Sequence, residues 1–161
     1  MPAEKLIDTL RKLLTLHRRL YEVALQKTDS LKNENIEEMT NLIQQEQKIV
    51  QAIKQAEEER IQCTGEFLNR KEDLIITACI EKASEIEKVK LREIYEEFSE
   101  ILNDLKVTNE LNKQLAHQSL QFTSLTLNML MPNENNIPNY NRSDSNKLTG
   151  NKRRSLFDSK A

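Results

Sequence analysis

Glycine, proline and aromatic residues are all scarce in this chain of 161 residues. It holds two glycines, three prolines and no tryptophan, and only 4% of its residues are aromatic. The prolines lie at positions 2, 132 and 138, so helix-compatible residues run from Ala3 to Met131 with Gly65 as the one interruption. No stretch shows the alternation of β-branched or aromatic residues that marks a strand. The sequence therefore predicts an all-α protein without a thick aromatic core.

Cysteine and histidine are equally rare, with two of each. Cys63 and Cys79 have no histidine nearby, which excludes a metal-ligand cluster and argues against a disulfide framework. We expect two buried or half-exposed thiols. His17 and His117 do not follow a glutamate at the spacing of di-iron bundles, and a glycine-rich phosphate loop is absent. We predict bundle histidines, no enzyme activity, no metal site and no cofactor.

Long apolar runs are also missing, and we expect no secretion leader. The chain begins with MPAEKLIDTL, which is charged from its fourth residue, and the longest apolar stretch (74–80) is too short to span a bilayer. The basic run NKRRS (151–155) is short and has no aromatic platform beside it. We therefore expect a cytoplasmic protein that neither inserts into a membrane nor binds nucleic acid.

Helical periodicity is what the chain has in abundance. A first helix is expected from near Ala3, and a second begins where Asn35 and Glu38 form a capping box and fades near Gly65. A shorter third helix is expected over residues 66–82. The predicted apolar faces are Leu6, Leu10, Leu13, Leu20, Ala24 and Leu31 in the first helix, and Met39, Ile43, Val50, Ile53 and Ala56 in the second.

The last predicted helix begins at a second capping box, Ser84 to Glu87, and nothing stops it before Pro132. At 1.5 Å per residue such a helix is roughly 70 Å long, so either it bends near residues 106–112 or one end projects. The predicted fold is an elongated antiparallel helical hairpin or bundle of three to four helices, with a long C-terminal helix.

The composition changes at Pro132. Residues 132–161 include seven asparagines, and six basic residues outnumber three acidic ones. We therefore predict two parts: a helical domain (1–131) and a disordered, asparagine-rich and locally basic tail (132–161). The apolar pair Leu156–Phe157 in this tail has the form of a short docking motif.

The end of the last helix is unusually poor in charge, because residues 109–131 include only Glu110 and Lys113. One face carries a seven-residue repeat that we interpret as the inner seam, with Gln118 as its polar member. The opposite face changes from Ser99, Lys106 and Lys113 to Leu120 and Leu127. The predicted seam consists of Ile94, Ile101, Thr108, Leu111, Leu115, Phe122, Leu125 and Met129, widened upstream by Phe98 and Leu105.

A helix that is apolar on two opposed faces must bury both of them. The partner could be another helix of the same chain, a second copy, or a different protein. The first alternative is a simple four-helix bundle, and the second is a self-associating coiled-coil scaffold. Serine, threonine, asparagine and glutamine interrupt the outer face, which suits a reversible contact with a different protein.

Three features make the chain resemble the FlgN-type flagellar export chaperones. They are the leucine ladder LIDTLRKLLTLHRRLYEVALQKTDSL, the glutamate-rich EQKIVQAIKQAEEER, and the Asn-x-x-Asn pattern of NELN before QLAHQSLQF. The likeness covers residues 3 to 131. Ala56 departs from it, because such a hairpin often places a larger apolar residue there.

The resemblance implies a cytoplasmic type III secretion chaperone, a monomer or weak dimer when free. Such chaperones bind the C-terminal helical segment of hook-associated proteins, prevent their premature assembly and bring them to the flagellar export gate. The client surface would lie on the helix from Asn109 to Met131, and Tyr140 or Phe157 would contact the gate. The candidate client-binding residues are Ala116, Leu120, Thr123, Leu127, Leu130 and Met131.

Overall fold

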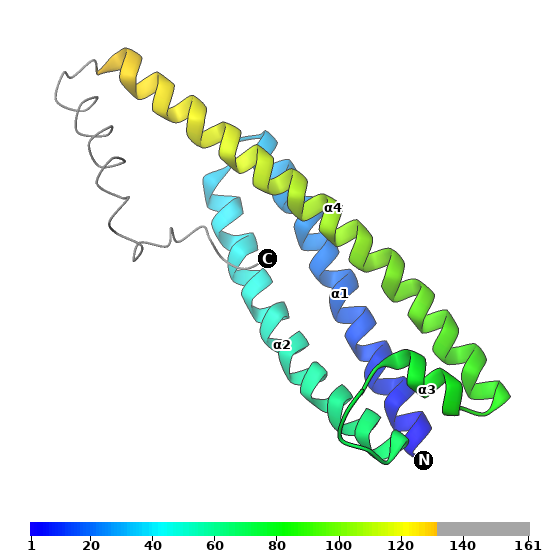
Figure 1. Ribbon diagram of the computed structural model, residues 1–161. Coiled ribbons are helices and arrows are strands. Elements are labelled where there is room, and N and C mark those ends of the chain that lie inside the picture. The colour runs from blue at the N-terminus through cyan, green and yellow to red at the C-terminus, as the bar shows by residue number, and fades with distance from the viewer. Residues whose placement is uncertain (132–161) are drawn as a thin grey trace, which may run out of the picture. The chain divides into compact units, whose positions relative to one another are not determined.

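The computed structural model describes residues 1–131, which form four α-helices and no strand (Figure 1). The helices are α1 (Pro2–Lys32), α2 (Ile36–Leu68), α3 (Ile76–Lys82) and α4 (Glu85–Leu130). The predicted all-α fold with a long last helix is confirmed. The chain divides into two compact units, Met1–His117 and Gln118–Ala161. The division into residues 1–131 and 132–161 stays a prediction.

Helices α1 and α2 form an antiparallel hairpin. Three ion pairs join them, Lys5–Glu66 at 3.4 Å, Lys12–Glu59 at 3.0 Å and Lys27–Glu46 at 2.5 Å. The residue numbers rise along α1 while they fall along α2, which fixes the antiparallel direction. Because most of these side chains are exposed, the pairs contribute little to stability, and apolar packing between the helices holds the hairpin.

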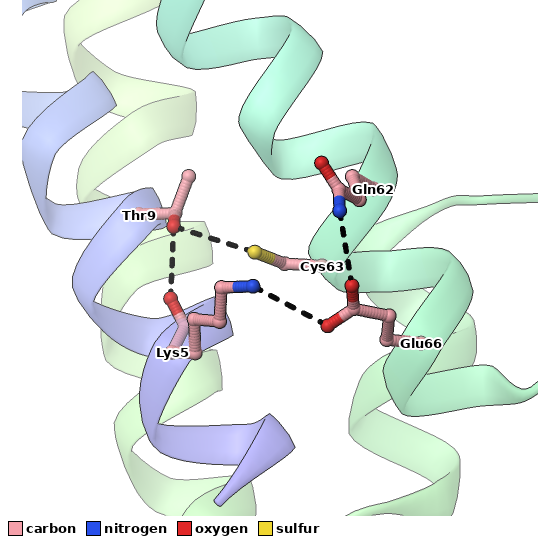
Figure 2. Close-up of polar contacts among 5 residues, drawn as sticks. All are labelled: Lys5, Thr9, Gln62, Cys63 and Glu66. Atoms are coloured by element: carbon pink, nitrogen blue, oxygen red, sulfur yellow. Dashed lines mark hydrogen bonds and ion pairs between the residues drawn. The ribbon is translucent and has the colours of Figure 1, made fainter.

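A close contact near the open end of the hairpin shows this packing (Figure 2). The Thr9 hydroxyl donates to the Lys5 carbonyl oxygen at 2.8 Å and lies 3.7 Å from the sulfur of Cys63. Beside it, Gln62 donates to Glu66 at 3.1 Å, and the same carboxylate pairs with Lys5. The polar groups of Thr9 are thus satisfied within the contact, although the residue is buried.

The predicted capping box is present at the end of the turn between α1 and α2. Asn35 accepts a hydrogen bond from the backbone N–H of Glu38 at 3.1 Å and donates through its side-chain amide to the Glu38 carboxylate at 3.2 Å. Glu34, just before the cap, has a φ of 55°. This left-handed residue lets the chain reverse direction within three residues.

The expected break at Gly65 is wrong, because α2 continues through it to Leu68 and ends with Asn69 in the left-handed conformation. Gly65 instead permits a close approach, since a Cβ there would lie 3.2 Å from the carbonyl oxygen of Arg70. The expected third helix is also shorter than predicted. Residues 69–75 form the connection, and α3 starts only at Ile76.

The predicted inward face of α1 is confirmed, since all six of its residues are buried or half-buried. The predicted face of α2 is partly wrong, because Ile43 and Val50 are exposed. Their neighbours Leu42 and Ile49 take the inward positions. Two adjacent aliphatic residues differ by about 100° around a helix, and periodicity alone cannot choose between them.

Helix α4 runs parallel to α1 in the Met1–His117 unit (Figure 1). Arg18 pairs with Glu97, and the ring of His17 meets Phe98 edge to face with centroids 5.3 Å apart. His17 is therefore a packing residue, as predicted. Both free cysteines are buried in the core cluster, as expected. This cluster comprises Leu6, Ile7, Leu10, Cys63, Cys79, Ala83, Leu91 and Ile94.

Candidate functional site

The described part of the second unit, from Gln118 to Met131, exposes every large apolar side chain that it contains. Leu120 is 57% exposed, Phe122 64% and Met129 73%. Neither aspartate, glutamate, lysine nor arginine occurs among these fourteen residues. Exposed apolar surface on this scale, unscreened by charge, makes this segment the candidate binding site. The full apolar set is Leu120, Phe122, Leu125, Leu127, Met129, Leu130 and Met131.

Five of the six predicted client-binding residues share one face of α4. At about 100° per residue, the positions of Ala116, Leu120, Thr123, Leu127 and Leu130 fall within an arc of about 80°. Ala116 is half-buried and the other four are exposed, and Met131 directly follows the helix and is also exposed. The helix therefore brings the predicted residues together, while their role stays a prediction.

The predicted inner seam holds in one part of α4 and fails in the other. Ile94, Ile101, Thr108 and Leu115 are buried or half-buried, as expected. Leu111 is exposed, and Asn112 is the buried residue beside it. Phe122, Leu125 and Met129 are exposed as well, so they do not belong to the described core. The same exposure makes them functional candidates that the sequence analysis assigned to packing.

The lengths of the helices give a signal that Phe122, Leu125 and Met129 are not part of the inner seam. Helix α4 has 46 residues, whereas α1 has 31 and α2 has 33. A regular apolar repeat cannot tell whether it faces its own chain or a partner, since both need the same period. Length is the independent signal, because a helix much longer than its neighbours has turns that they cannot cover.

The two threonines of this segment are bonded to their own helix. Thr123 donates its hydroxyl hydrogen to the Ser119 carbonyl oxygen, and Thr126 donates to that of Phe122, both at 2.9 Å. A threonine bonded to its own helix presents mainly its methyl group outward. The two threonines therefore interrupt the apolar surface less than their polarity suggests.

Nothing in the first unit resembles an activated nucleophile or acid–base pair. Burial raises the pKa of the Cys79 thiol, and the nearby Arg60 opposes this only in part. The Arg60 pKa is also raised, because its guanidinium hydrogen-bonds to Glu57, and the same group donates to the Leu74 carbonyl oxygen at 3.0 Å. Arg60 thus holds the connection between α2 and α3 in place.

An apolar groove of about 410 Å³ also lies in this unit, between α1, α2, the start of α3 and the first part of α4. Leu13 and His17 of α1, Ile76 of α3, and Tyr95 and Leu102 of α4 are among its lining residues. The sequence does not predict this groove, because it forms only where the helices pack together.

The remaining predictions concern a metal site, membrane insertion, His117 and the residues of the tail. Among residues 1–131, three or more histidine, cysteine or acidic side chains never gather as a metal site would require. The helices of this described part include none that is long and apolar enough to cross a membrane. His117 is exposed at the end of the first unit. The predicted gate residues, Tyr140 and Phe157, lie outside the described residues, as does the Leu156–Phe157 motif.

An all-α hairpin with a long last helix and an exposed, uncharged apolar end places the chain among all-α helical-hairpin proteins. The FlgN protein family matches residues 1–147. The chain belongs to the FlgN family, and it is therefore a flagellar type III export chaperone. It is also 42% identical over 161 residues, covering all of both chains, to the uncharacterized protein YvyG of Bacillus subtilis (strain 168). No solved structure matches the chain.

Proposed function

We propose that this chaperone binds the C-terminal helical segment of hook-associated proteins in the cytoplasm, through the end of α4, and hands them to the flagellar export gate. The single observation that carries the proposal is the exposure of all seven large apolar side chains between Leu120 and Met131. The residues given the main anchoring role are Ala116, Leu120, Thr123, Leu127, Leu130 and Met131.

The chemistry of this surface suits an amphipathic helix as the ligand. Such a helix buries its apolar stripe in an apolar helical surface and keeps its polar side in water. Phe122, Leu125 and Met129 lie on the other side of α4 from Leu120 and Leu127 and are equally exposed. Two helices of a client, one on each side, would therefore cover both sides of the segment. Methionine side chains at its end can adapt to clients of different shape.

The expected affinity is moderate. Two to four fully buried leucines contribute roughly 1.5–3 kcal/mol each. Ordering of the client and of interface side chains costs several kcal/mol. With four fully buried leucines the balance reaches about −8 kcal/mol, which corresponds to a dissociation constant near 1 μM, and fewer anchors give weaker binding. Such a complex forms at cellular concentrations and can still be released at the export gate.

The proposal is tested by co-expressing the full chain with a hook-associated protein and purifying the complex. The double variant L120D/L127D places two carboxylates on the proposed surface, and we expect it to lower client affinity at least a hundredfold. V107D is the matched control, since Val107 is an equally exposed aliphatic residue of α4 in the first unit. V107D should retain the client.

Light scattering of the same variants without client separates chaperone from scaffold. A wild-type chain that is a monomer or weak dimer and loses only its client in L120D/L127D supports the proposal. A stable dimer that the same substitutions dissociate, with no client bound by the wild type, would instead establish the self-associating scaffold. Unchanged client capture by L120D/L127D would refute this surface as the binding site.

A further inference from the structure

A buried hydrogen-bonded node joins α1 to α4 inside the Met1–His117 unit. Asn112 and Thr28 are only 6% and 7% exposed. The Thr28 Oγ1 lies 2.5 Å from Asn112 Oδ1 and must be the donor, because a side-chain carbonyl oxygen can only accept. Asn112 Nδ2 donates to the Ala24 carbonyl oxygen at 2.9 Å. Asn109, the first asparagine of NELN, is exposed instead.

Asn112 occupies a core position of a seven-residue repeat. One series of inward residues along α4 is Leu91, Phe98, Leu105 and Asn112, and the other is Ile94, Ile101, Thr108 and Leu115. All eight are buried or half-buried. Asparagine is the one member of the first series that is not a large apolar residue.

The repeat gives two alignments of α4 on α1 a similar apolar pattern up to this point. If α4 moved by seven residues, Phe98 would take the place of Leu91 and Ile101 that of Ile94. Asp104 would take the place of Glu97 beside Arg18, so the ion pair between the helices would be rebuilt. Some contacts favour the observed alignment, because the shift would break the edge-to-face contact of His17 with Phe98 and place Thr108 where Ile101 now packs. The seven-residue repeat and the ion pair do not distinguish the two alignments.

The two alignments differ at residue 112. After the shift Asn112 would lie where Leu105 now lies, in a layer that is 5% exposed, and its amide would lose both Thr28 and the Ala24 carbonyl. A buried amide without partners is strongly disfavoured. A single buried asparagine at a coiled-coil core position is a known means of setting register.

We propose that Asn112 is the positioning residue that sets the register of α4 on α1, through its two hydrogen bonds to Thr28 and Ala24. The consequence for binding rests on the proposed function. In the shifted register Phe122 would take the place of Leu115, and apolar residues of the client-binding segment would be drawn into the core. Asn112 thus keeps that segment available for clients.

The register can be measured directly on the free, full-length chain with a short bismaleimide. The pair R18C/E97C reports the observed register, and R18C/D104C reports the shifted one, about 10 Å further along α4. The native Cys63 and Cys79 are buried and should not compete. With Asn112 present, we expect the first pair to cross-link at least ten times faster. In an N112L background the two rates should come within threefold of each other.

The asparagine can also be moved. The double variant N112L/S119N places an asparagine one heptad later, where it would meet Thr28 and Ala24 only in the shifted register. We expect R18C/D104C to cross-link at least ten times faster than R18C/E97C in this background. N109L is the control, because Asn109 is exposed, and it should leave the original preference unchanged.

The outcomes distinguish register from stability and from client binding. A preference for R18C/E97C that persists in both N112L and N112L/S119N would overturn the proposal. If circular dichroism shows that N112L is unfolded, T28V provides the second test, since it removes only the hydroxyl donor. T28V should raise the R18C/D104C cross-linking rate at least threefold. An unchanged rate would count against the proposal. None of these measurements uses a client, so failure of the proposed function would not affect them.

Discussion

At the scale of single residues, the start of α4 depends on a carboxylate. Glu87 accepts a hydrogen bond from the backbone N–H of Ser84 at 2.9 Å, and this bond, together with one from the Ser84 side chain, holds the Glu87 pKa below its usual value. The ionised form is therefore favoured in the folded chain. Its stabilising effect is present above the unfolded pKa and is lost as the pH falls through the folded pKa.

This arrangement predicts the pH titration of Glu87. In S84A the side-chain bond is gone while the larger contribution from the backbone remains. We expect the Glu87 midpoint, measured by carbon-13 NMR, to rise part of the way toward the usual value of about 4.3. S99A, an exposed serine within α4, should leave it unchanged. A midpoint unaffected by S84A would show that the hydroxyl does not act on Glu87.

Asn35 carries a comparable role at the start of α2. Its side chain accepts from the Glu38 N–H at 3.1 Å, and alanine would leave that donor without this partner. We expect N35A to lower the free energy of unfolding by about 1 kcal/mol, measured in urea. N41A is the matched control in the exposed interior of the same helix, where alanine should be neutral or slightly stabilising. Equal effects of both variants would contradict a capping role.

These two caps were predictable from sequence, whereas Asn112 was not. A capping box is read within four residues, because its donors and acceptors are neighbours in the chain. The partners of Asn112, Thr28 and Ala24, lie more than eighty residues away. The heptad pattern placed Leu111 in the seam instead, since a leucine is the default choice for a core position.

At the scale of elements, helix α2 is packed around a small residue, Ala56, which is fully buried. A close-packed interior leaves no room for a larger side chain at such a position. We expect A56L to destabilise the chain by about 1–3 kcal/mol through overpacking. A52L, at a half-buried alanine one turn earlier, should cost less. A stable A56L would mean that the two helices can move apart easily.

The sequence predicted which segments are helical better than it predicted where the helices end or which of their residues are buried. Periodicity identified the three long helices because it extends over many turns of each, whereas α3 has only seven residues. It misplaced the boundary at Gly65, since a glycine within a helix can serve a close approach rather than a break. It also chose Ile43 and Val50 over Leu42 and Ile49, because the choice depends on which side α1 occupies.

At the scale of the whole molecule, client binding and delivery to the export gate are proposed to reside in different parts of the chain. The two functions can be tested separately. The proposed client-binding residues end at Met131, while Tyr140 and Phe157, proposed to contact the export gate, follow in residues 132–161. A chain ending at Met131 should therefore keep client affinity within about twofold, because it retains the whole proposed surface. It should fail to deliver the client.

Delivery is measured as hook-associated protein in the culture medium, and capture by co-purification from the cells. The truncated chain should lower the amount of secreted client at least tenfold and leave client capture intact. L120D/L127D should abolish both secretion and capture. Y140A and F157A then identify which aromatic residue acts, since each removes one ring and leaves the rest of the tail unchanged. Loss of capture in the truncated chain would show instead that residues 132–161 hold the client directly, because the surface from Ala116 to Met131 would then be insufficient.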